Sequence, residues 1–246
     1  AAAAAIAGLD RLDVVVANEN SSTFSVLPGD GTGALGARTD RATGANPQGL
    51  ALADLDGDGW LDVVTANFGA NSASVFRALG GGTFAARVDL GVGSRPTQVA
   101  VGDVTHDGVL DLVVVDGGDI LGMTISVLRG VGGGAFAPRL AVTTGYDPYD
   151  VALADFDRDG ALDVAVSCTS SPYVTLLRGA RGLGVARRSA FGAGDSPTGL
   201  ATGDFDGDGR VDLAVANQND GTVSILMNDW QPSGHTRSEG VPPRLR

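Results

Sequence analysis

Residues 54–62 read Asp-Leu-Asp-Gly-Asp-Gly-Trp-Leu-Asp, and the last two of them begin the segment Leu-Asp-Val-Val-Thr-Ala-Asn at residues 61–67. A Leu/Val-Asp-Val/Leu motif followed by small apolar residues occurs five times. Its aspartates are spaced by 49, 49, 52 and 49 residues: Asp13, Asp62, Asp111, Asp163 and Asp212. Self-similarity at a fixed period of about 40–50 residues is the signature of a repeat architecture. The chain is therefore predicted to consist of five equivalent units.

Each unit is predicted to form four short strands. In the second unit an apolar strand ends at Asp54, the acidic loop leads into residues 61–67, and residues 73–79 form an alternating third strand. A glycine-rich turn, residues 80–82 in this unit, leads to a fourth strand. That strand is expected to carry an arginine in four units: Arg38, Arg87, Arg139 and Arg188. Four strands in about 50 residues match a propeller blade, and no segment has the 3.6-residue apolar period of a helix.

The predicted fold is all-β, a β-propeller of four-stranded blades over residues 1–229. The blades are expected at approximately 1–46, 47–95, 96–147, 148–196 and 197–229. Five repeats make either a closed five-blade ring or part of a larger ring, and the sequence leaves both open. Residues 230–246 lose the pattern and contain three of the ten prolines, so an extended C-terminal tail is expected there.

The charge composition argues against several classes of function. The chain has 27 Asp, 2 Glu, 17 Arg and no Lys, for a formal net charge of −12. Such a chain repels the phosphates of nucleic acids and anionic membrane surfaces, and it has no apolar run long enough to span a bilayer. We therefore expect neither nucleic acid as a partner nor direct insertion into a membrane. Cys168 is the single cysteine, so no internal disulfide can form and the compartment stays open.

In four units the loop between the first two strands carries Asp-x-Asp-x-Asp-Gly-x-x-Asp or a close variant. Calcium takes six to eight oxygen ligands in flexible geometry, and carboxylates at alternate positions of a curled loop can converge on one ion. The residue after the glycine would offer its carbonyl oxygen, and the last aspartate would close the site. The predicted ligands are Asp54, Asp56, Asp58, Trp60 and Asp62; Asp103, Thr105, Asp107, Val109 and Asp111; Asp155, Asp157, Asp159, Ala161 and Asp163; and Asp204, Asp206, Asp208, Arg210 and Asp212.

About four bound Ca²⁺ ions are expected. Fifteen of the 27 aspartates lie in these loops, where unpaired like charges would be costly without a cation. The third unit is predicted to bind most weakly, because Thr105 replaces a carboxylate. Magnesium is the weaker candidate because it demands stricter geometry. An EF-hand is excluded, since its twelfth position requires glutamate and the loops have Thr65, Val114, Val166 or Val215 there.

Three elements together resemble the FG-GAP (VCBS-type) repeats of integrin α-subunit propellers. They are the Gly-Thr-Phe-Ala-Ala-Arg segment at 82–87, the acidic loops, and a Gly-x-x-Pro element at 44–47, 93–96, 145–148 and 194–197. Similar repeats occur in bacterial extracellular proteins, some fungal lectins and propellers attached to polysaccharide lyases. The resemblance covers roughly residues 1–229. It implies calcium in the loops between the first two strands and ligand contact on the opposite face, although relatives commonly have more than five blades.

Recognition rather than catalysis is the predicted function, because no catalytic constellation such as a nucleophile elbow is present. We expect a calcium-binding, extracytoplasmic module (secreted, periplasmic or at the cell surface) that binds a protein or a glycan, as adhesion proteins and lectins do. The alternatives are a structural subunit of a larger extracytoplasmic complex, docked through the tail, and a non-catalytic propeller region of a polysaccharide-active enzyme. The candidate ligand residues are the three tyrosines, which the predicted topology places opposite the calcium loops: Tyr146, Tyr149 and Tyr173.

Overall fold

The computed structural model describes residues 2–4, 11–117, 123–179 and 188–229, so the predicted tail lies outside the described residues. The described strands form five antiparallel sheets of three or four strands, which we call blades 1 to 5 in chain order, and one small two-stranded sheet. Blade 1 has β1 (Ala2–Ala4), β2 (Asp13–Asn18), β3 (Thr23–Leu27) and β4 (Thr39–Ala42). Blade 2 has β5 (Pro47–Ala53), β6 (Asp62–Asn67), β7 (Ser72–Phe76) and β8 (Val88–Gly91). A short 3₁₀ helix, η1 (Glu19–Ser21), joins β2 to β3.

The last three blades continue the pattern. Blade 3 has β9 (Pro96–Gly102), β10 (Asp111–Asp116), β11 (Thr124–Leu128) and β14 (Leu140–Thr143), with the small hairpin β12 (Gly130–Gly132) and β13 (Ala135–Phe136) inserted before β14. Blade 4 has β15 (Pro148–Ala154), β16 (Asp163–Cys168), β17 (Tyr173–Leu177) and β18 (Arg188–Gly192). Blade 5 has β19 (Pro197–Gly203), β20 (Asp212–Asn217) and β21 (Thr222–Leu226) among the described residues.

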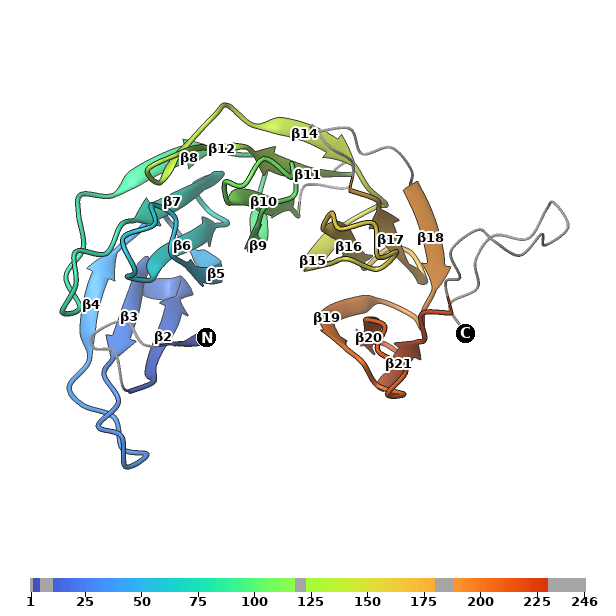
Figure 1. Cartoon of the computed structure of the whole chain (residues 1–246), viewed down its shortest axis with the longest axis horizontal. Helices are drawn as coiled ribbons and strands as arrows, with labels where there is room; N and C mark the ends of the chain where they lie inside the picture. The colour runs from blue at the N-terminus through green and yellow to red at the C-terminus, as the bar shows by residue number, and fades with distance from the viewer. Residues whose placement is uncertain (1, 5–10, 118–122, 180–187, 230–246) are drawn as a thin grey trace, which may run out of the picture.

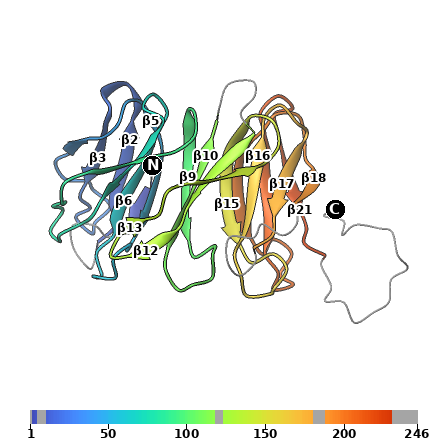
Figure 2. The same cartoon turned by 90° about the horizontal axis from the view of Figure 1, so that it is seen from above.

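The prediction of an all-β propeller with four-stranded blades is confirmed. Figure 1 shows the sheets side by side along an arc. The first strands of blades 2 to 5 (β5, β9, β15 and β19) lie on the inner side, and the fourth strands of blades 1 to 4 (β4, β8, β14 and β18) lie on the outer side. Figure 2 shows the strands running between the two faces of this arc. The arc is open between blades 1 and 5 in Figure 1, so the described residues do not form a closed ring.

The repeated aspartate fixes one register in every blade. The last residue of the first strand pairs with it each time: Ala4 with Asp13, Ala53 with Asp62, Gly102 with Asp111, Ala154 with Asp163, and Gly203 with Asp212. Strand β1 (Ala2–Ala4) therefore occupies the place that residues 51–53 hold in blade 2. The arginine positions differ slightly from the prediction: only Arg188 lies in its fourth strand, while Arg38, Arg87 and Arg139 immediately precede theirs.

The apolar core lies between blades rather than inside one sheet. Val64 and Ala66 of β6 pack in one cluster with Leu112 and Val114 of β10, and similar clusters join each other pair of successive blades. Every residue of β6, β10 and β16 is buried. These second strands have both faces covered, which explains why they read as nearly continuous apolar runs.

The Gly-x-x-Pro element turns the chain into the first strand of the next blade. A Cβ on Gly93 would lie 2.1 Å from the carboxyl carbon of Asp116, so only glycine fits there. Arg95, just before the proline, has φ 51°, and the same left-handed conformation recurs at the matching positions of the other three elements. This tight turn brings the start of each first strand onto one face of the arc.

Candidate functional site

The Gly-x-x-Pro element lies at the start of each first strand in blades 2 to 5, and the acidic loop lies at the end of that strand, between it and the second strand. In blade 2 the carboxylate of Asp54 accepts the backbone N–H groups of Gly57, Asp58 and Gly59 at 2.8, 3.1 and 2.9 Å. Gly57 and Gly59 have φ angles of 79° and 89°, a conformation that glycine adopts without strain. The first aspartate therefore curls the loop around its own side chain.

The other three loops repeat this geometry. The matching first aspartates, Asp103, Asp155 and Asp204, accept backbone N–H groups from the fifth and sixth loop positions. At the seventh position the backbone N–H donates to the fifth-position aspartate in every loop, and the donors are Trp60, Val109, Ala161 and Arg210. Those are the residues whose carbonyl oxygens are predicted ligands, so the loops hold them in equivalent positions.

The last aspartate of each loop has a structural role that the sequence did not indicate. Asp163 is fully buried, and its two oxygens accept the N–H groups of Phe156 and Gly179 at 3.1 and 2.8 Å. Burial raises the pKa of this carboxyl to about 6, and it raises the pKa values of Asp62 and Asp111 as well. Asp62, Asp111 and Asp212 each bind two backbone N–H groups in the same way.

Carboxylates converge in three of the four loops. Carboxylate oxygens lie within 4.8 Å of one another in three groups: Asp54, Asp56 and Asp58; Asp155, Asp157 and Asp163; and Asp204, Asp206 and Asp212. Among the described residues, no such group of acidic side chains forms in the blade 3 loop, where Thr105 replaces a carboxylate. The spacing within each group suits a single cation with several oxygen ligands.

Two buried oxygens at the third loop position support a cation there. The Oγ1 atom of Thr105 and the Oδ1 atom of Asp157 are buried and have no hydrogen-bond partner among the described residues. Buried polar atoms normally have a partner, so these oxygens are suited to a ligand. Arginines from the end of the third strand approach the loop edges, as in the ion pairs of Arg77 with Asp56 at 3.5 Å and Arg178 with Asp157 at 2.9 Å. The donor set consists of hard oxygens, which fits Ca²⁺.

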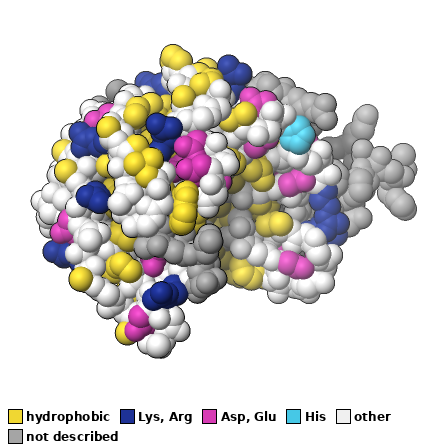
Figure 3. Space-filling view, turned by 60° about the vertical axis from the view of Figure 1, so that its left-hand side comes forward, with side chains coloured by type: hydrophobic (Ala, Val, Ile, Leu, Met, Phe, Trp, Pro, Cys, Tyr) yellow, Lys and Arg dark blue, Asp and Glu magenta, His cyan; other side chains and the backbone are white. Residues whose placement is uncertain are grey.

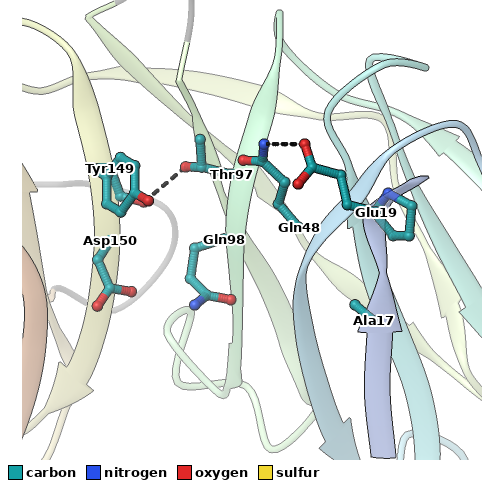
Figure 4. Close-up of a pocket in the computed structure, with 8 residues that line it drawn as sticks. Ala17, Glu19, Gln48, Thr97, Gln98, Tyr149 and Asp150 are labelled. Carbon is teal, nitrogen blue, oxygen red and sulfur yellow. Dashed lines mark hydrogen bonds between the residues drawn. The ribbon is translucent and has the colours of Figure 1, made fainter. Parts of the chain in front are cut away.

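A pocket of about 370 Å³ lies at the other end of the first strands. Figure 4 shows its walls, which come from four blades: Ala17, Glu19, Pro47, Gln48, Thr97, Gln98, Tyr149 and Asp150. Gln48 Nε2 donates to Glu19 Oε1 at 3.2 Å, and the Thr97 hydroxyl donates to the carbonyl oxygen of Tyr149 at 2.7 Å. The pocket therefore has a polar wall whose side chains are already held in place.

Asp150 is the most enclosed acid of the pocket. Its carboxylate accepts the backbone N–H groups of Val151 and Leu200, both at 2.8 Å, so it bridges blades 4 and 5. Burial is the largest influence on this group and raises its pKa. A first strand of seven residues separates the pocket from the acidic loop of the same blade, a distance of ~20 Å at about 3.3 Å per residue.

The structure places one of the three predicted tyrosines in this pocket. Tyr149 lines it and is 48% exposed, whereas Tyr146 and Tyr173, also exposed, are not among its lining residues. The prediction missed Glu19, Gln48 and Gln98. A signal existed for the two glutamines, because Gln48 lies one residue and Gln98 two residues after the proline of a Gly-x-x-Pro element, near the start of an inner strand. Glu19 in η1 had no comparable signal.

Comparison with known proteins identifies the repeats. Models of the FG-GAP-like repeat match residues 10–65, 54–114 and 115–166, and an FG-GAP repeat model matches residues 196–226. The chain belongs to the FG-GAP-like repeat family. Among curated proteins, no sequence matches it. No helix in the described residues is long and apolar enough to cross a membrane.

Solved structures with low sequence identity share the fold of this FG-GAP chain. BBS1N, in complex with ARL6DN, has a TM-score of 0.63 and 15% identity over 92% of this chain and 64% of its own. An Agrocybe aegerita lectin that recognises non-reducing terminal N-acetylglucosamine has a TM-score of 0.58 and 18% identity. The match covers 92% of this chain and 62% of the lectin. The V. cholerae biofilm matrix protein Bap1 has a TM-score of 0.54 and 16% identity, and the match covers 89% of this chain and 34% of Bap1. The chain thus spans less than two thirds of the length of each.

Proposed function

We propose that this FG-GAP propeller is a calcium-binding, extracytoplasmic recognition module whose ligand enters the pocket beside Tyr149. The observation that carries the proposal is the separation of two kinds of site on one scaffold. Acidic loops of repeated geometry lie at one end of the first strands, and a pocket with polar walls from four blades lies at the other end. The ions would stiffen the blades, and the pocket would select the ligand.

The case for calcium is chemical. A Ca²⁺ ion binds carboxylate, hydroxyl and backbone carbonyl oxygens at about 2.3–2.6 Å. Three of the loops bring carboxylate oxygens together, and the fourth has the buried Thr105 hydroxyl. Four such ions would offset eight of the twelve net negative charges. A bound ion stabilises only the folded loop, by about 2.7 kcal/mol at one hundred times its dissociation constant. Extracellular calcium levels would therefore favour the folded propeller.

The chemistry of the pocket favours a glycan as the ligand. Sugar hydroxyls donate and accept hydrogen bonds, which suits the carboxylates of Glu19 and Asp150 and the amides of Gln48 and Gln98. The ring of Tyr149 offers a flat apolar surface together with a hydroxyl. The pocket volume lies within the range of about 300–1,000 Å³ typical of small-molecule sites, enough for a terminal sugar. The similar Agrocybe aegerita lectin recognises a terminal sugar, N-acetylglucosamine.

A protein ligand is the second candidate, since BBS1N was solved in complex with ARL6DN, another protein. The surface shown in Figure 3 carries dispersed charges of both signs among hydrophobic side chains, with no broad basic area for a polyanion. A protein partner would have to place a side chain in the pocket, because that is where the first strands of several blades present polar groups together.

A glycan array probed with the purified chain in calcium tests the proposal. We expect binding to a restricted set of glycans that share a terminal sugar, and competition by that free monosaccharide. The same array in EDTA, at a temperature where the apoprotein stays folded, should lose less than tenfold in affinity, because the loops lie ~20 Å from the pocket. Failure to bind any glycan on a broad array would contradict the glycan assignment. Direct coordination of sugar by calcium would instead show as complete loss of binding in EDTA.

A further inference from the structure

Each of the four acidic loops has an arginine at its edge. Four ion pairs join a guanidinium to an aspartate that is a predicted calcium ligand: Arg77 with Asp56, Arg129 with Asp107, Arg178 with Asp157, and Arg210 with Asp208. In blades 2 to 4 the arginine is the first residue after the third strand, and in blade 5 it comes from the loop itself. Blade 1 has no predicted calcium site, and Pro28 occupies the matching position there. A guanidinium therefore accompanies the acidic loop wherever that loop is complete.

The ion pair of blade 4 is the most enclosed of the four. Arg178 Nη1 lies 2.9 Å from Asp157 Oδ2, and the two side chains are 22% and 10% exposed. The other oxygen, Asp157 Oδ1, is buried and has no hydrogen-bond partner among the described residues. Asp157 also belongs to the three-acid group of its loop. The arginine thus occupies one oxygen of a predicted ligand and leaves the other oxygen for a cation.

In blade 2 the arginine is enclosed by the next blade. The turn between β12 and β13 of blade 3 lies against the blade 2 loop, where the N–H of Gly134 donates to the carbonyl oxygen of Leu55 at 3.2 Å. A Cβ atom on Gly134 would lie 2.8 Å from Cδ of Arg77 and 3.7 Å from Cβ of Asp56. The turn therefore packs against the arginine and limits its side chain to positions near the loop.

The charge of the arginine matters most when the loop holds no ion. The carboxylates of one loop lie within 4.8 Å of one another, so they repel each other, and a neighbouring guanidinium offsets part of that repulsion. Once an ion is bound, the arginine is a second positive charge beside the same carboxylates, and the two positive charges repel. The arginine therefore stabilises the empty loop more than the loaded loop.

We propose that these arginines are resident counterions of the acidic loops: they keep the empty loops folded, and they lower the affinity for calcium. The inference rests on the proposed calcium binding. A group that stabilises the free state more than the bound state weakens binding by the same free-energy difference, because the two equilibria are linked. A propeller with such loops would release its ions without unfolding.

The competing role is orientation of the ligand. Groups that hold a metal ligand in place raise the affinity for the metal, and their loss typically costs about 10–100-fold. Distances favour the counterion role, because Arg77 and Arg129 lie 3.5 and 3.9 Å from their aspartates. These separations exceed those of an orienting hydrogen bond, whereas charge acts across them. The two roles predict opposite changes in calcium affinity when the arginine is removed.

Arg178→Met tests the sign of this change, because it removes the charge and keeps an unbranched apolar side chain. We expect the melting temperature to fall in EDTA and to fall less in saturating calcium. Isothermal titration calorimetry should show one site that binds calcium about 3–10-fold more tightly than in the wild type. Arg77→Met should change a second site in the same direction. Arg178→Lys keeps the charge without the planar fork, so it should restore most of the wild-type behaviour.

Two further variants assign the effect to the loop. Arg87→Met is the matched control, because Arg87 forms its 3.0 Å ion pair with Asp89 on the outer strand β8, and its loss should shift the melting temperature equally in both media. In an Asp157→Asn background, Arg178→Met should no longer lower the melting temperature in EDTA, since the partner charge is gone.

The outcomes separate this inference from the calcium proposal on which it rests. Weaker calcium binding by Arg178→Met and Arg77→Met would assign the arginines an orienting role and overturn the inference. Equal melting shifts in calcium and EDTA would overturn it as well. Both results leave calcium binding by the wild type in place. A folded wild type that takes up no calcium would instead refute the calcium proposal and this inference together.

Discussion

The carboxylate of Asp62 accepts the backbone N–H of Ala78 at 2.7 Å, which ties the second strand of blade 2 to the turn that follows its third strand. Its other oxygen accepts the N–H of Leu55 from the acidic loop at 3.0 Å. Asp62→Ala would leave both buried N–H groups without an acceptor. Each such loss costs about 1–3 kcal/mol, so we expect the free energy of unfolding to fall by about 2–6 kcal/mol in urea titrations.

A loss should remain in EDTA, because the two N–H groups need an acceptor in either case, and it should be larger in calcium, because Asp62 is also a predicted ligand of the stabilising ion. Asp13 accepts the N–H of Gly29 in blade 1, for which no calcium ligands are predicted. Asp13→Ala is therefore a useful companion variant, with an expected loss in both media. A destabilisation by Asp62→Ala that disappears in EDTA would show that the aspartate acts through the ion alone.

Asp58 should behave differently, because it lies in the exposed part of the loop and is a predicted calcium ligand. We expect Asp58→Ala to lower the melting temperature clearly in calcium and only slightly in EDTA, since removal of a ligand weakens the ion that stabilises the folded state. Asp30→Ala is the control. Asp30 lies in an exposed turn of blade 1, where hydrogen bonds from Thr32 lower its pKa, and its replacement should be insensitive to calcium. Equal shifts for both variants in calcium would contradict the loop assignment.

Native mass spectrometry during a calcium titration should show up to four added ions, with the blade 3 site filling last. That loop has Thr105 in place of a carboxylate, and the described part of the loop forms no three-acid group. Thr105→Asp should bring the fourth addition to lower calcium concentration without affecting the first three. A folded sample that takes up no calcium would refute the metal proposal, and so would uptake that is unchanged in variants of the first loop aspartates.

Much of this architecture could be predicted because it repeats. Five aspartates at a spacing close to 49 residues fixed the number of units, and the structure gives each of them the same register. The alternation of loops between two faces followed from the strand order. Repetition also explains why the apolar core appears between blades, since every second strand needs cover on both faces.

The rest depended on contacts that a local pattern does not contain. The structural role of Asp62 requires Ala78, 16 residues away, and the pocket combines side chains from four blades. The sequence grouped the three tyrosines only because their loops lie on the same face of the propeller. In the structure Tyr149 lies on the inner strand β15 and lines the pocket, whereas Tyr146 and Tyr173 do not line it. Closure of the ring requires a blade to cover the outer faces of blades 1 and 5, and the number of repeats does not specify that blade.

Asp116 offers a test of pH dependence away from the loops. It is buried at the end of β10 and accepts hydrogen bonds from Thr124, Ser126 and Gly93. Burial raises the pKa of this carboxyl. A raised pKa means that the folded state holds its proton more tightly than the unfolded state, so this contribution to stability is lost as the pH rises from about 4 through the folded pKa.

Asp116→Asn should therefore be tolerated at pH 7, with a stability equal to that of the wild type or up to about 1 kcal/mol higher. The matching residue of blade 5 is Asn217, which donates to Thr222 and Ser224 and accepts the N–H of Gly194. The advantage should shrink as the pH falls toward 4, because the raised pKa makes Asp116 increasingly protonated in the folded wild type. Urea titrations at both pH values measure the difference, and a loss above 2 kcal/mol at pH 7 would show that the charged form is required.

Tyr149→Ala should weaken glycan binding by at least tenfold while the melting temperature and the calcium count stay unchanged. The ring is 48% exposed at the pocket, so its loss removes little packing, whereas an aromatic contact buried by a ligand contributes about 2 kcal/mol or more when it is a hot spot. The backbone oxygen that binds Thr97 is kept in alanine, which leaves the wall of the pocket in place. Tyr146→Ala is the closest control, because Tyr146 is exposed three residues earlier and does not line the pocket. Tyr173→Ala, at the start of β17, tests whether the ligand reaches beyond the pocket. Unchanged affinity in the Tyr149 variant would remove the pocket from consideration, and an equal loss in all three would favour a larger protein partner spread over this face.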